Sequence, residues 1–343
     1  MRSRRTRIKL ISIFFAVVAI GIFIVIIIFT AKTKRAISLE NSPNPQKNFF
    51  SEIKFRTYDL KGKEINVKSE SIYENKKNNY VFKNMVSNFT MPNGEILTIS
   101  SDITNAIRED RMQCEFIGNV KLSTDSGLIM KTKSLFVDFN KKIAHGNTEV
   151  VISQDDTQVS GKKYFFDMNK NVLILTGNAN GLLKSDRVHA DMLVIRFNDM
   201  HEKNIKNIDA IGNATYTTKD YVLKAQKNIL YSSNRIDAQS DAILLYKKNG
   251  NDYDIRSDSM QAEINNGRLD NIKTNTSLTI KTNNATIRAD RGVLKDDIIE
   301  VLGNVVISGE QGNIFGNSAT LNVKTGDVFI SKSSGIVNDG THR

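Results

Sequence analysis

A short phrase recurs roughly every 31 residues along most of this 343-residue chain, and it constrains the fold more than any other feature. The phrase begins with an apolar residue and a mostly polar or basic one, has Ser, Thr, Gly or Ala third, and often an acid fourth. A fixed period of this size is typical of stacked units that bury their apolar faces only against their neighbours. We therefore expect one elongated array. The copies begin at Val67, Ile99, Met130, Val159, Val188, Leu223, Ile255, Ile287 and Ile314.

Apolar residues with a period of two lie between these copies and predict half-buried β-strands. Tight-turn sequences such as Asn249-Gly250 and Lys324–Asp327 separate them. No helical pattern of useful length follows residue 30. The predicted fold class is therefore all-β: an elongated, open β-jellyroll of two facing antiparallel sheets built from these repeats. The residues predicted to face inward are Leu135, Val137, Phe139, Leu193, Ile195, Phe197, Leu321 and Val323.

A Gly-Asn pair forms a second recurring marker and precedes most copies of the phrase. Gly and Asn both accept positive φ, so the pair predicts a recurrent turn that keeps the strands in register. In the degenerate stretch 216–277, Ser240-Asp241 stands in the place of Gly-Asn. The copies are Gly118-Asn119, Gly146-Asn147, Gly177-Asn178, Gly212-Asn213 and Gly303-Asn304.

The N-terminus predicts a membrane anchor. Residues 1–9 form a basic segment, 10–30 are a nearly unbroken apolar run long enough to cross a bilayer as one helix, and 31–48 form a linker. A cleaved signal peptide is the alternative, but the run exceeds the usual apolar length, and no small residue stands three before a cut after Ala31. Five positive charges precede the span and three follow it, which favours a cytoplasmic N-terminus. The prediction is a single-pass inner-membrane protein whose bulk is periplasmic.

The formal charge of +11 does not indicate nucleic-acid binding. Eight basic residues and no acids lie in residues 1–35, and the remaining surplus is spread without a basic block. Cys114 is the single cysteine, so no intramolecular disulfide is expected. Hydrogen-bonded ladders and apolar burial must hold the body together.

No active site is readable in the sequence. The four histidines show no metal spacing, and His189 with Asp191 is interpreted as pairing on one face of a repeated phrase. The recurring acids lie in separate repeats, too far apart for a carboxylate pair of about 5–9.5 Å. A β-helical carbohydrate-active enzyme is disfavoured on that ground. We predict that the chain is not an enzyme and needs neither metal nor cofactor.

Two stretches resemble a known family. The segment from Gly303-Asn304 to Thr325-Gly326 is similar to the OstA-type repeat of LptA, while Tyr58–Gly62 and the Gly118–Leu122 segment look like LptC. The chain thus resembles the LptC/LptA (OstA-like) lipopolysaccharide transport family. The resemblance implies an LptC-like β-jellyroll at 49–182, an LptA/OstA-like β-jellyroll at 183–337 and a flexible tail at 338–343.

This resemblance implies a role in the lipopolysaccharide export bridge. The implied partners are lipopolysaccharide through its lipid A portion, the permease subunits of the inner-membrane ABC transporter, and another jellyroll protein. That last partner is a separate LptA or the N-terminal domain of the outer-membrane translocon. The chain departs from the family because LptA normally stands as a separate soluble protein, whereas here its repeat continues a tethered chain.

Two features of the expected array would serve transport. If the sheets splay apart, the inward residues line an apolar trough of nearly equivalent sites along which acyl chains slide. Open sheet edges recruit further strands, so Ile53 and Phe55 at one end and Val328 and Ile330 at the other are the predicted partner edges. The tail 333–343 is expected to be too polar and flexible to cap the second edge. The alternative is a structural or assembly β-array of the envelope that does not carry lipid.

Overall fold

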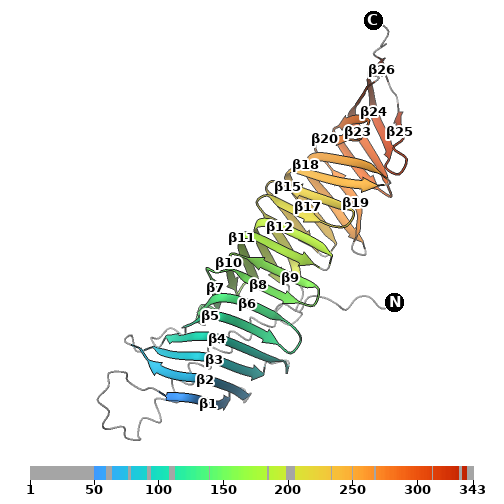
Figure 1. Ribbon diagram of the computed structural model, residues 1–343. Helices are drawn as coiled ribbons and strands as arrows, with labels where there is room; N and C mark the ends of the chain where they lie inside the picture. Colours follow the sequence, from blue (N-terminus) through green and yellow to red (C-terminus); the bar gives the residue numbers. More distant parts are fainter. Residues whose placement is uncertain are drawn as a thin grey trace, which may run out of the picture. The chain divides into compact units, whose positions relative to one another are not determined.

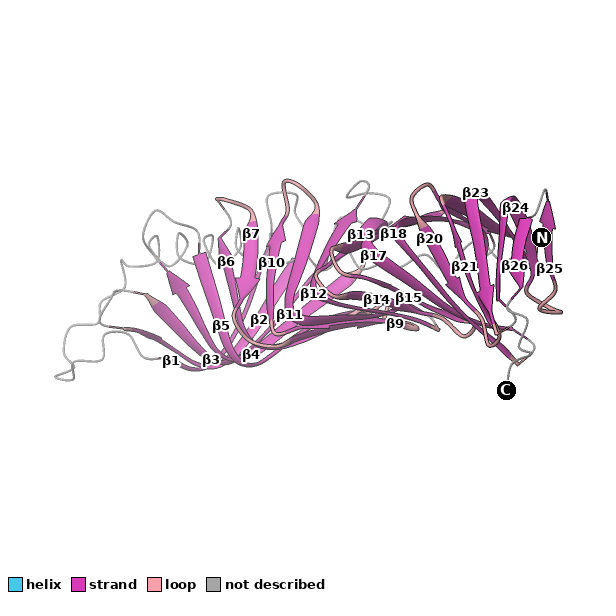
Figure 2. Cartoon of the chain, turned by 90° about the horizontal axis from the view of Figure 1, so that it is seen from above, coloured by secondary structure: helices cyan, strands magenta, loops and turns pink. Residues whose placement is uncertain are grey.

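The computed structural model describes residues 50–58, 64–75, 79–90, 94–107, 113–138, 140–183, 185–197, 205–232, 234–248, 250–265, 268–310, 312–331 and 334–337. These residues form strands joined by turns and loops, with no helix among them (Figure 2). The pairings between strands are antiparallel throughout the described ladders, as in β2 with β3 and β17 with β18. The all-β, antiparallel prediction is confirmed.

The chain forms two compact units. Unit 1 comprises the described residues up to Ala179 together with Ile195–Ile205, and unit 2 comprises Asn180–Val194 with the residues from Lys206 onward. The division passes within β11 (Val172–Leu183) and β12 (Asp186–Phe197). The strands before β11 are β1 (Phe50–Tyr58), β2 (Glu64–Glu74), β3 (Tyr80–Thr90), β4 (Ile96–Ile107), β5 (Gln113–Thr124), β6 (Ile129–Asp138), β7 (Ile143–Gly146), β8 (Val150–Gln154), β9 (Thr157–Gly161) and β10 (Lys163–Asp167) (Figure 1).

The strands that follow β12 come in groups, with four short strands before each pair of long ones. The long pairs are β17 with β18 and β23 with β24, and most short strands pair with only part of a long one. In chain order the strands are β13 (Ile205–Ile211), β14 (Ala214–Thr217), β15 (Tyr221–Ala225), β16 (Asn228–Ser232), β17 (Arg235–Lys248), β18 (Asn251–Asn265), β19 (Arg268–Thr274), β20 (Leu278–Lys281), β21 (Ala285–Ala289), β22 (Arg291–Lys295), β23 (Ile298–Gly309), β24 (Gly312–Asn322), β25 (Val328–Ser331) and β26 (Ser334–Val337).

The alternation of apolar and polar residues along each strand decides which face of the strand is buried. In β5, Cys114, Phe116, Val120 and Leu122 are buried, while the residues between them are partly or fully exposed. This period of two is what a strand with one face on an apolar interior requires. Phe116 and Leu122, both with no exposed surface, are among the largest side chains in the core of unit 1. The apolar half of the pattern therefore fixes the register of the ladder.

Each long strand belongs to two layers. The first half of β17 pairs with β16, as in Ile236 opposite Tyr231, and its second half pairs with β15, as in Ile243 opposite Lys224. Between Gln239 and Ala242 the register with β18 shifts, so two residues of β17 oppose one of β18. Such a bulge bends a strand. We call this bend the corner, and the two halves of the unit on either side of it the two layers.

The Gly-Asn pairs sit at these corners. Gly118 and Asn119 have φ of 73° and 43°, and they form the bulge at which β5 shifts register against β6. Gly303-Asn304 forms the same bulge in β23, opposite β24. The expectation of positive φ is confirmed at four of the five pairs, and the exception is Gly146-Asn147. Ser240-Asp241 also adopts positive φ and bends β17 without a glycine.

The acid of the recurring phrase closes the corner. Asn119 donates its side-chain amide to the Asp102 carboxylate at 2.9 Å, and the same bond joins Asn304 to Asp290 at 3.0 Å. A Cβ on Gly118 would overlap that carboxylate and would lie 3.0 Å from the Cβ of Asp102. We call this arrangement of acid, glycine and asparagine the corner clasp. A third copy joins Asn213 to Asp191 at 3.1 Å.

The C-terminal end forms one further short strand. Residues 334–337, within the tail expected to be too polar and flexible to cap the last edge, form β26 and pair with the first half of β24. Short β25 pairs with the second half of the same strand. Because β26 pairs with β24 and not with β25, the open edge at Val328 and Ile330 stays a prediction.

Within the described ranges, no helix combines the length and the apolar character needed to cross a membrane. The predicted span at 10–30, with the flanking segments 1–9 and 31–48, lies outside the described residues.

Replacing Gly118 with Ala should destabilise unit 1 more than replacing Gly127 with Ala. Both glycines have φ near +80°, so both variants bear the left-handed strain of roughly 1–2 kcal/mol. Only Gly118 lies against another side chain, because nothing lies within 4 Å of a Cβ at Gly127. We expect an extra loss of roughly 1–3 kcal/mol in the free energy of unfolding for the Gly118 variant. Equal losses in urea denaturation of the two variants would show that the clasp contributes nothing.

Candidate functional site

Chemistry-bearing side chains do not gather in the part of the chain that the structure describes, where no group of three or more His, Cys, Asp or Glu residues has metal-binding geometry. Burial raises the pKa of the Cys114 thiol, which disfavours the reactive thiolate. His145 packs on Phe136 with ring centroids 4.9 Å apart. The Nδ1 atom of His189 is 2.8 Å from the Asn180 amide oxygen, and Asp191 instead holds Asn213. His189 thus pairs across the β11–β12 hairpin and Asp191 pairs with a neighbouring turn, which is the surface or hairpin pairing predicted for them.

The predicted inward residues lie inside the two layers. Leu135 and Val137 of β6, Leu193 and Ile195 of β12, and Leu321 of β24 are at most 2% exposed. Phe197 and Val323 are also buried. Phe139 lies outside the described residues. The interior is therefore closed and apolar at these positions in this conformation.

The predicted edge residues lie in β1 and in β25, the last strand but one. In β1, Ile53 is half-buried and is paired in register with Ser69 of β2, and Phe55 is paired in register with Val67. In β25, Val328 and Ile330 are half-buried, whereas Phe329 between them is 66% exposed. Other exposed apolar side chains lie on the neighbouring strands, namely Leu302 of β23 and Ile314 and Phe315 of β24.

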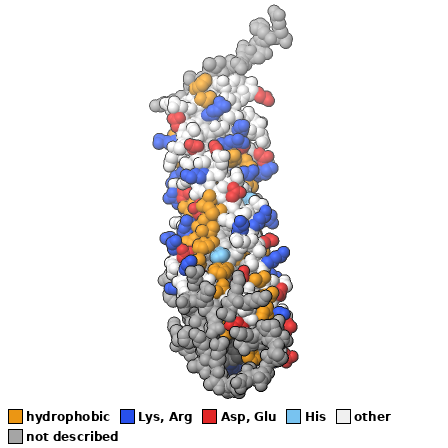
Figure 3. All heavy atoms as spheres, turned by 90° about the vertical axis from the view of Figure 1, so that its left-hand side faces the viewer, with side chains coloured by type: hydrophobic (Ala, Val, Ile, Leu, Met, Phe, Trp, Pro, Cys, Tyr) orange, Lys and Arg blue, Asp and Glu red, His pale blue; other side chains and the backbone are white. Residues whose placement is uncertain are grey.

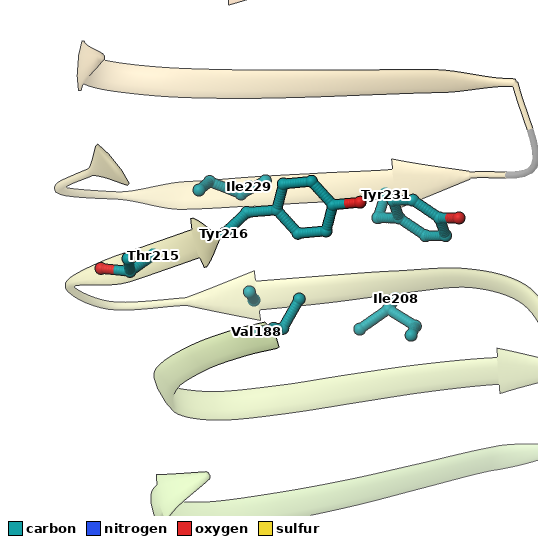
Figure 4. A pocket seen from close by; sticks show the side chains of 7 residues that line it. Val188, Ile208, Thr215, Tyr216, Ile229 and Tyr231 are labelled. Carbon is teal, nitrogen blue, oxygen red and sulfur yellow. The ribbon is translucent and has the colours of Figure 1, made fainter. Parts of the chain in front are cut away.

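A narrow slot opens between the two layers of unit 2. It is too tight to admit a water molecule. Its walls come from both layers: Val188 belongs to one, and Ile208, Ala210 and Ile229 belong to the other. The rings of Tyr216 and Tyr231 lie side by side next to it with their hydroxyls pointing the same way (Figure 4). The slot is apolar inside and has phenols on its border.

Tyrosines surround this slot. Tyr216 donates its hydroxyl to the Asp186 carboxylate at 2.7 Å, and its ring lies 6.1 Å from Tyr221 and 5.9 Å from Tyr231. Burial raises the pKa of Tyr216 far above its ordinary value, and Tyr221 and Asp186 raise it further. Burial, followed by the Asp186 charge, also raises the pKa of Tyr221 and Tyr231. All three phenols therefore stay neutral donors at physiological pH.

The sequence-based prediction missed these tyrosines. Five of the chain's nine tyrosines fall between Tyr216 and Tyr253, and this clustering was the available signal. Their spacing is irregular, so no period of two marks them as one face. Charged side chains do not mark a site on the face shown in Figure 3 either, because Lys and Arg are interspersed there with Asp and Glu.

Residues 15–184, which make 170 of 343, match the family described as lipopolysaccharide-assembly, LptC-related. Among solved structures, the chain is similar to LptH from Pseudomonas aeruginosa, described as the LptA-homologous periplasmic component of a lipopolysaccharide transport device. That likeness has 15% identity and a TM-score of 0.28, and covers 33% of this chain and 80% of LptH. The search of curated proteins gave no match.

The stability of unit 2 should fall as the pH rises above about 10, the ordinary tyrosine pKa. Because burial raises the folded-state pKa of Tyr216, Tyr221 and Tyr231, the stabilisation is complete below the unfolded pKa and is lost at higher pH. Replacing Tyr216 with Phe should make this alkaline loss shallower, because one ionisable group is gone. Urea unfolding followed by circular dichroism from pH 8 to 11.5 measures it. A slope identical to that of the unchanged chain would contradict the assignment, and the pH 8 value isolates the lost hydrogen bond.

Proposed function

Because residues 15–184 match the LptC-related family of lipopolysaccharide assembly, we propose that the chain is an inner-membrane-anchored periplasmic component of the lipopolysaccharide export bridge. In this proposal it receives lipopolysaccharide from the inner-membrane ABC transporter and passes it along its apolar interior toward the outer membrane. The family match is the observation that carries the proposal.

We further propose that the chain joins two modules of one bridge. The LptC-like module covers 49–182 and the LptA/OstA-like module covers 183–337, followed by the tail 338–343. The end of the family match at residue 184 supports a boundary there. The corner clasp supports one architecture on both sides, because it occurs at Gly118 and again at Gly303.

The apolar interior is the proposed lipid path. Its two layers enclose side chains such as Val137 and Leu321, and an acyl chain entering between them gains roughly 0.8 kcal/mol per buried methylene. The interior is filled by its own side chains at present, so the layers must part to admit lipid. In this proposal the chain is not an enzyme and uses no cofactor. The energy for net movement of the lipid comes from the transporter.

The anchor and the partners complete the proposal. Residues 10–30 span the inner membrane with the basic segment 1–9 in the cytoplasm, from the charge bias of the sequence. The permease subunits then meet the N-terminal edge at Ile53 and Phe55. A separate LptA, or the translocon's N-terminal domain, meets the C-terminal edge at Val328 and Ile330.

A photo-crosslinking residue at Leu321 should capture lipopolysaccharide, whereas one at Lys324 should not. Leu321 is 2% exposed and points inward, while Lys324 is exposed and pairs with Asp297 at 3.0 Å. Immunoblotting of irradiated cells for lipopolysaccharide on the protein measures capture. Equal labelling at the two positions, or none at either, would contradict a lipid path.

Mass spectrometry of lipid co-purified with the unchanged chain separates transport from the structural β-array alternative. An array that only assembles carries no lipopolysaccharide.

Replacing Val328 and Ile330 with Pro should abolish outer-partner crosslinking and leave inner-membrane association intact. Asn322 donates its N–H to the Asp327 carbonyl at 2.9 Å, and alternation along the ladder then turns the N–H groups of Val328 and Ile330 away from β24. Proline removes those outward donors without breaking the pairing of β25 with β24.

Phe329 points its N–H toward β24 by the same alternation, so Phe329→Pro is the matched control for loss of β25 itself. If crosslinking to the outer partner survives the double substitution, this edge is not the contact.

A further inference from the structure

A row of tyrosines runs along one side of unit 2. In neighbouring strands, Tyr221 lies directly opposite Tyr246, and Tyr246 lies directly opposite Tyr253. Directly opposed residues share a face of the sheet. The rings of Tyr246 and Tyr253 have centroids 6.3 Å apart. Tyr216 continues the row, 6.1 Å from Tyr221.

This row lies on the side of unit 2 opposite the corner. Tyr246 and Tyr253 flank the turn at Gly250, while the bulge of the same two strands lies at Ser240-Asp241. We call this side the mouth, because it is where the two layers end in turns.

Hydroxyls of the row bridge the mouth from one layer to the other. Tyr253 donates to the Val323 carbonyl at 3.0 Å, directly after β24. Tyr246 donates to the Asp297 carboxylate at 3.2 Å, in the turn between β22 and β23. Both acceptors belong to the layer facing the tyrosines. Farther along the mouth, Tyr216 of one layer contacts Tyr231 of the other.

The interior next to this row is ready to accept an acyl chain only if the layers part. The slot beside Tyr216 and Tyr231 is lined by Val188, Ile208, Ala210 and Ile229, and it is too tight for water (Figure 4). Parting the layers would break the bonds of Tyr246 and Tyr253. In the opened state these two hydroxyls take other acceptors, either water or oxygen atoms of a bound ligand.

We propose that the tyrosine row binds the junction between the polar head and the acyl chains of an acylated amphiphile. This inference rests on the proposed lipid-carrying function and adds the residues that recognise the lipid. The hydroxyls of Tyr246 and Tyr253 exchange Asp297 and Val323 for ester, amide or phosphate oxygens at the junction. The acyl chains enter between the layers, and the head stays in water outside the mouth.

This exchange explains why the row contains tyrosine and not phenylalanine. Phenols suit a boundary with an apolar body on one side and polar groups on the other. A mouth held by phenylalanine would offer no donors to the bound lipid. A mouth held by ion pairs would place charges against acyl chains, which is costly.

The test is the double substitution of Tyr246 and Tyr253 with Phe in the full chain, which keeps both rings and removes both hydroxyls. The probes are fluorescently labelled lipopolysaccharide and labelled phosphatidylglycerol, and fluorescence anisotropy after addition of excess unlabelled lipid measures the rate at which each bound probe dissociates. Tyr73→Phe, in unit 1 with its ring 5.9 Å from the Lys83 ammonium, is the matched control.

We expect the bound probes to dissociate from the double variant about tenfold faster, because two neutral hydrogen bonds to the ligand are lost, and to dissociate from the control at an unchanged rate. Faster dissociation of one probe only identifies which lipid supplies the acceptors, and faster dissociation of both identifies the shared acyl junction.

The contrary idea is a clamp that merely holds the mouth shut and makes no bond to the lipid. Removing a clamp eases opening, so association would become faster and the melting temperature would fall while dissociation stays unchanged, and that result overturns the proposal. If the double variant fails to fold by circular dichroism, Tyr253→Phe alone gives the same comparison, with about threefold faster dissociation expected. A full chain with unchanged sequence that binds neither probe would instead refute the lipid-carrying function itself.

Discussion

The corner is the constraint on which the rest of this structure depends. A strand that must serve two layers has to bend without leaving its backbone groups unpaired, and a bulge with positive φ does this. Asp102 lies over Gly118 and accepts from Asn119, so the acid fills the space that a Cβ would need. This contact explains two features of the sequence: the acid in the recurring phrase, and the Gly-Asn pair on another strand that binds it.

The two sides of unit 2 are held by interactions of different strength. At the corner the layers are joined by continuous strands, and separating them there would break the chain's own ladders. At the mouth the bridges are single hydrogen bonds, such as Tyr253 to Val323, each worth about 0.5–1.5 kcal/mol. Any parting of the layers must therefore begin at the mouth. The row of corners then acts as the hinge of that opening.

Much of this fold could be predicted from periodicity. The alternation of apolar and polar residues that placed Leu135, Val137 and Leu321 inside is a local property of each strand. It continues beyond the bulge because the strand faces an apolar core on both sides of the bulge. Positive φ at Gly118 and Gly303 followed from residue type. Ser240-Asp241 shows the limit of that inference, because tertiary pairing imposes the same conformation on a residue pair that does not favour it.

Contacts between separate segments were the part of the fold that the sequence did not indicate. Residues 334–337 pair with the first half of β24, and nothing within those four residues points to that partner. The tyrosine row was missed for a similar reason. Tyr246 and Asp297 are 51 residues apart, and only the facing of the two layers brings them together.

The aromatic residues also show that the repeats are not equivalent sites. Unit 1 buries mainly phenyl rings, including Phe82, Phe116 and Phe166, which need only van der Waals contact, and one phenol, Tyr164, which donates to the Ser134 carbonyl at 2.7 Å. Unit 2 buries the phenols Tyr216 and Tyr253, whose hydroxyls need an acceptor at a set distance. A ligand that binds between phenyl rings gains binding free energy mainly from buried apolar area. A ligand that binds beside phenols gains it by placing oxygen atoms where the hydroxyls can donate to them. A uniform trough of equal free energy, which the period alone would predict, is therefore not what these side chains provide.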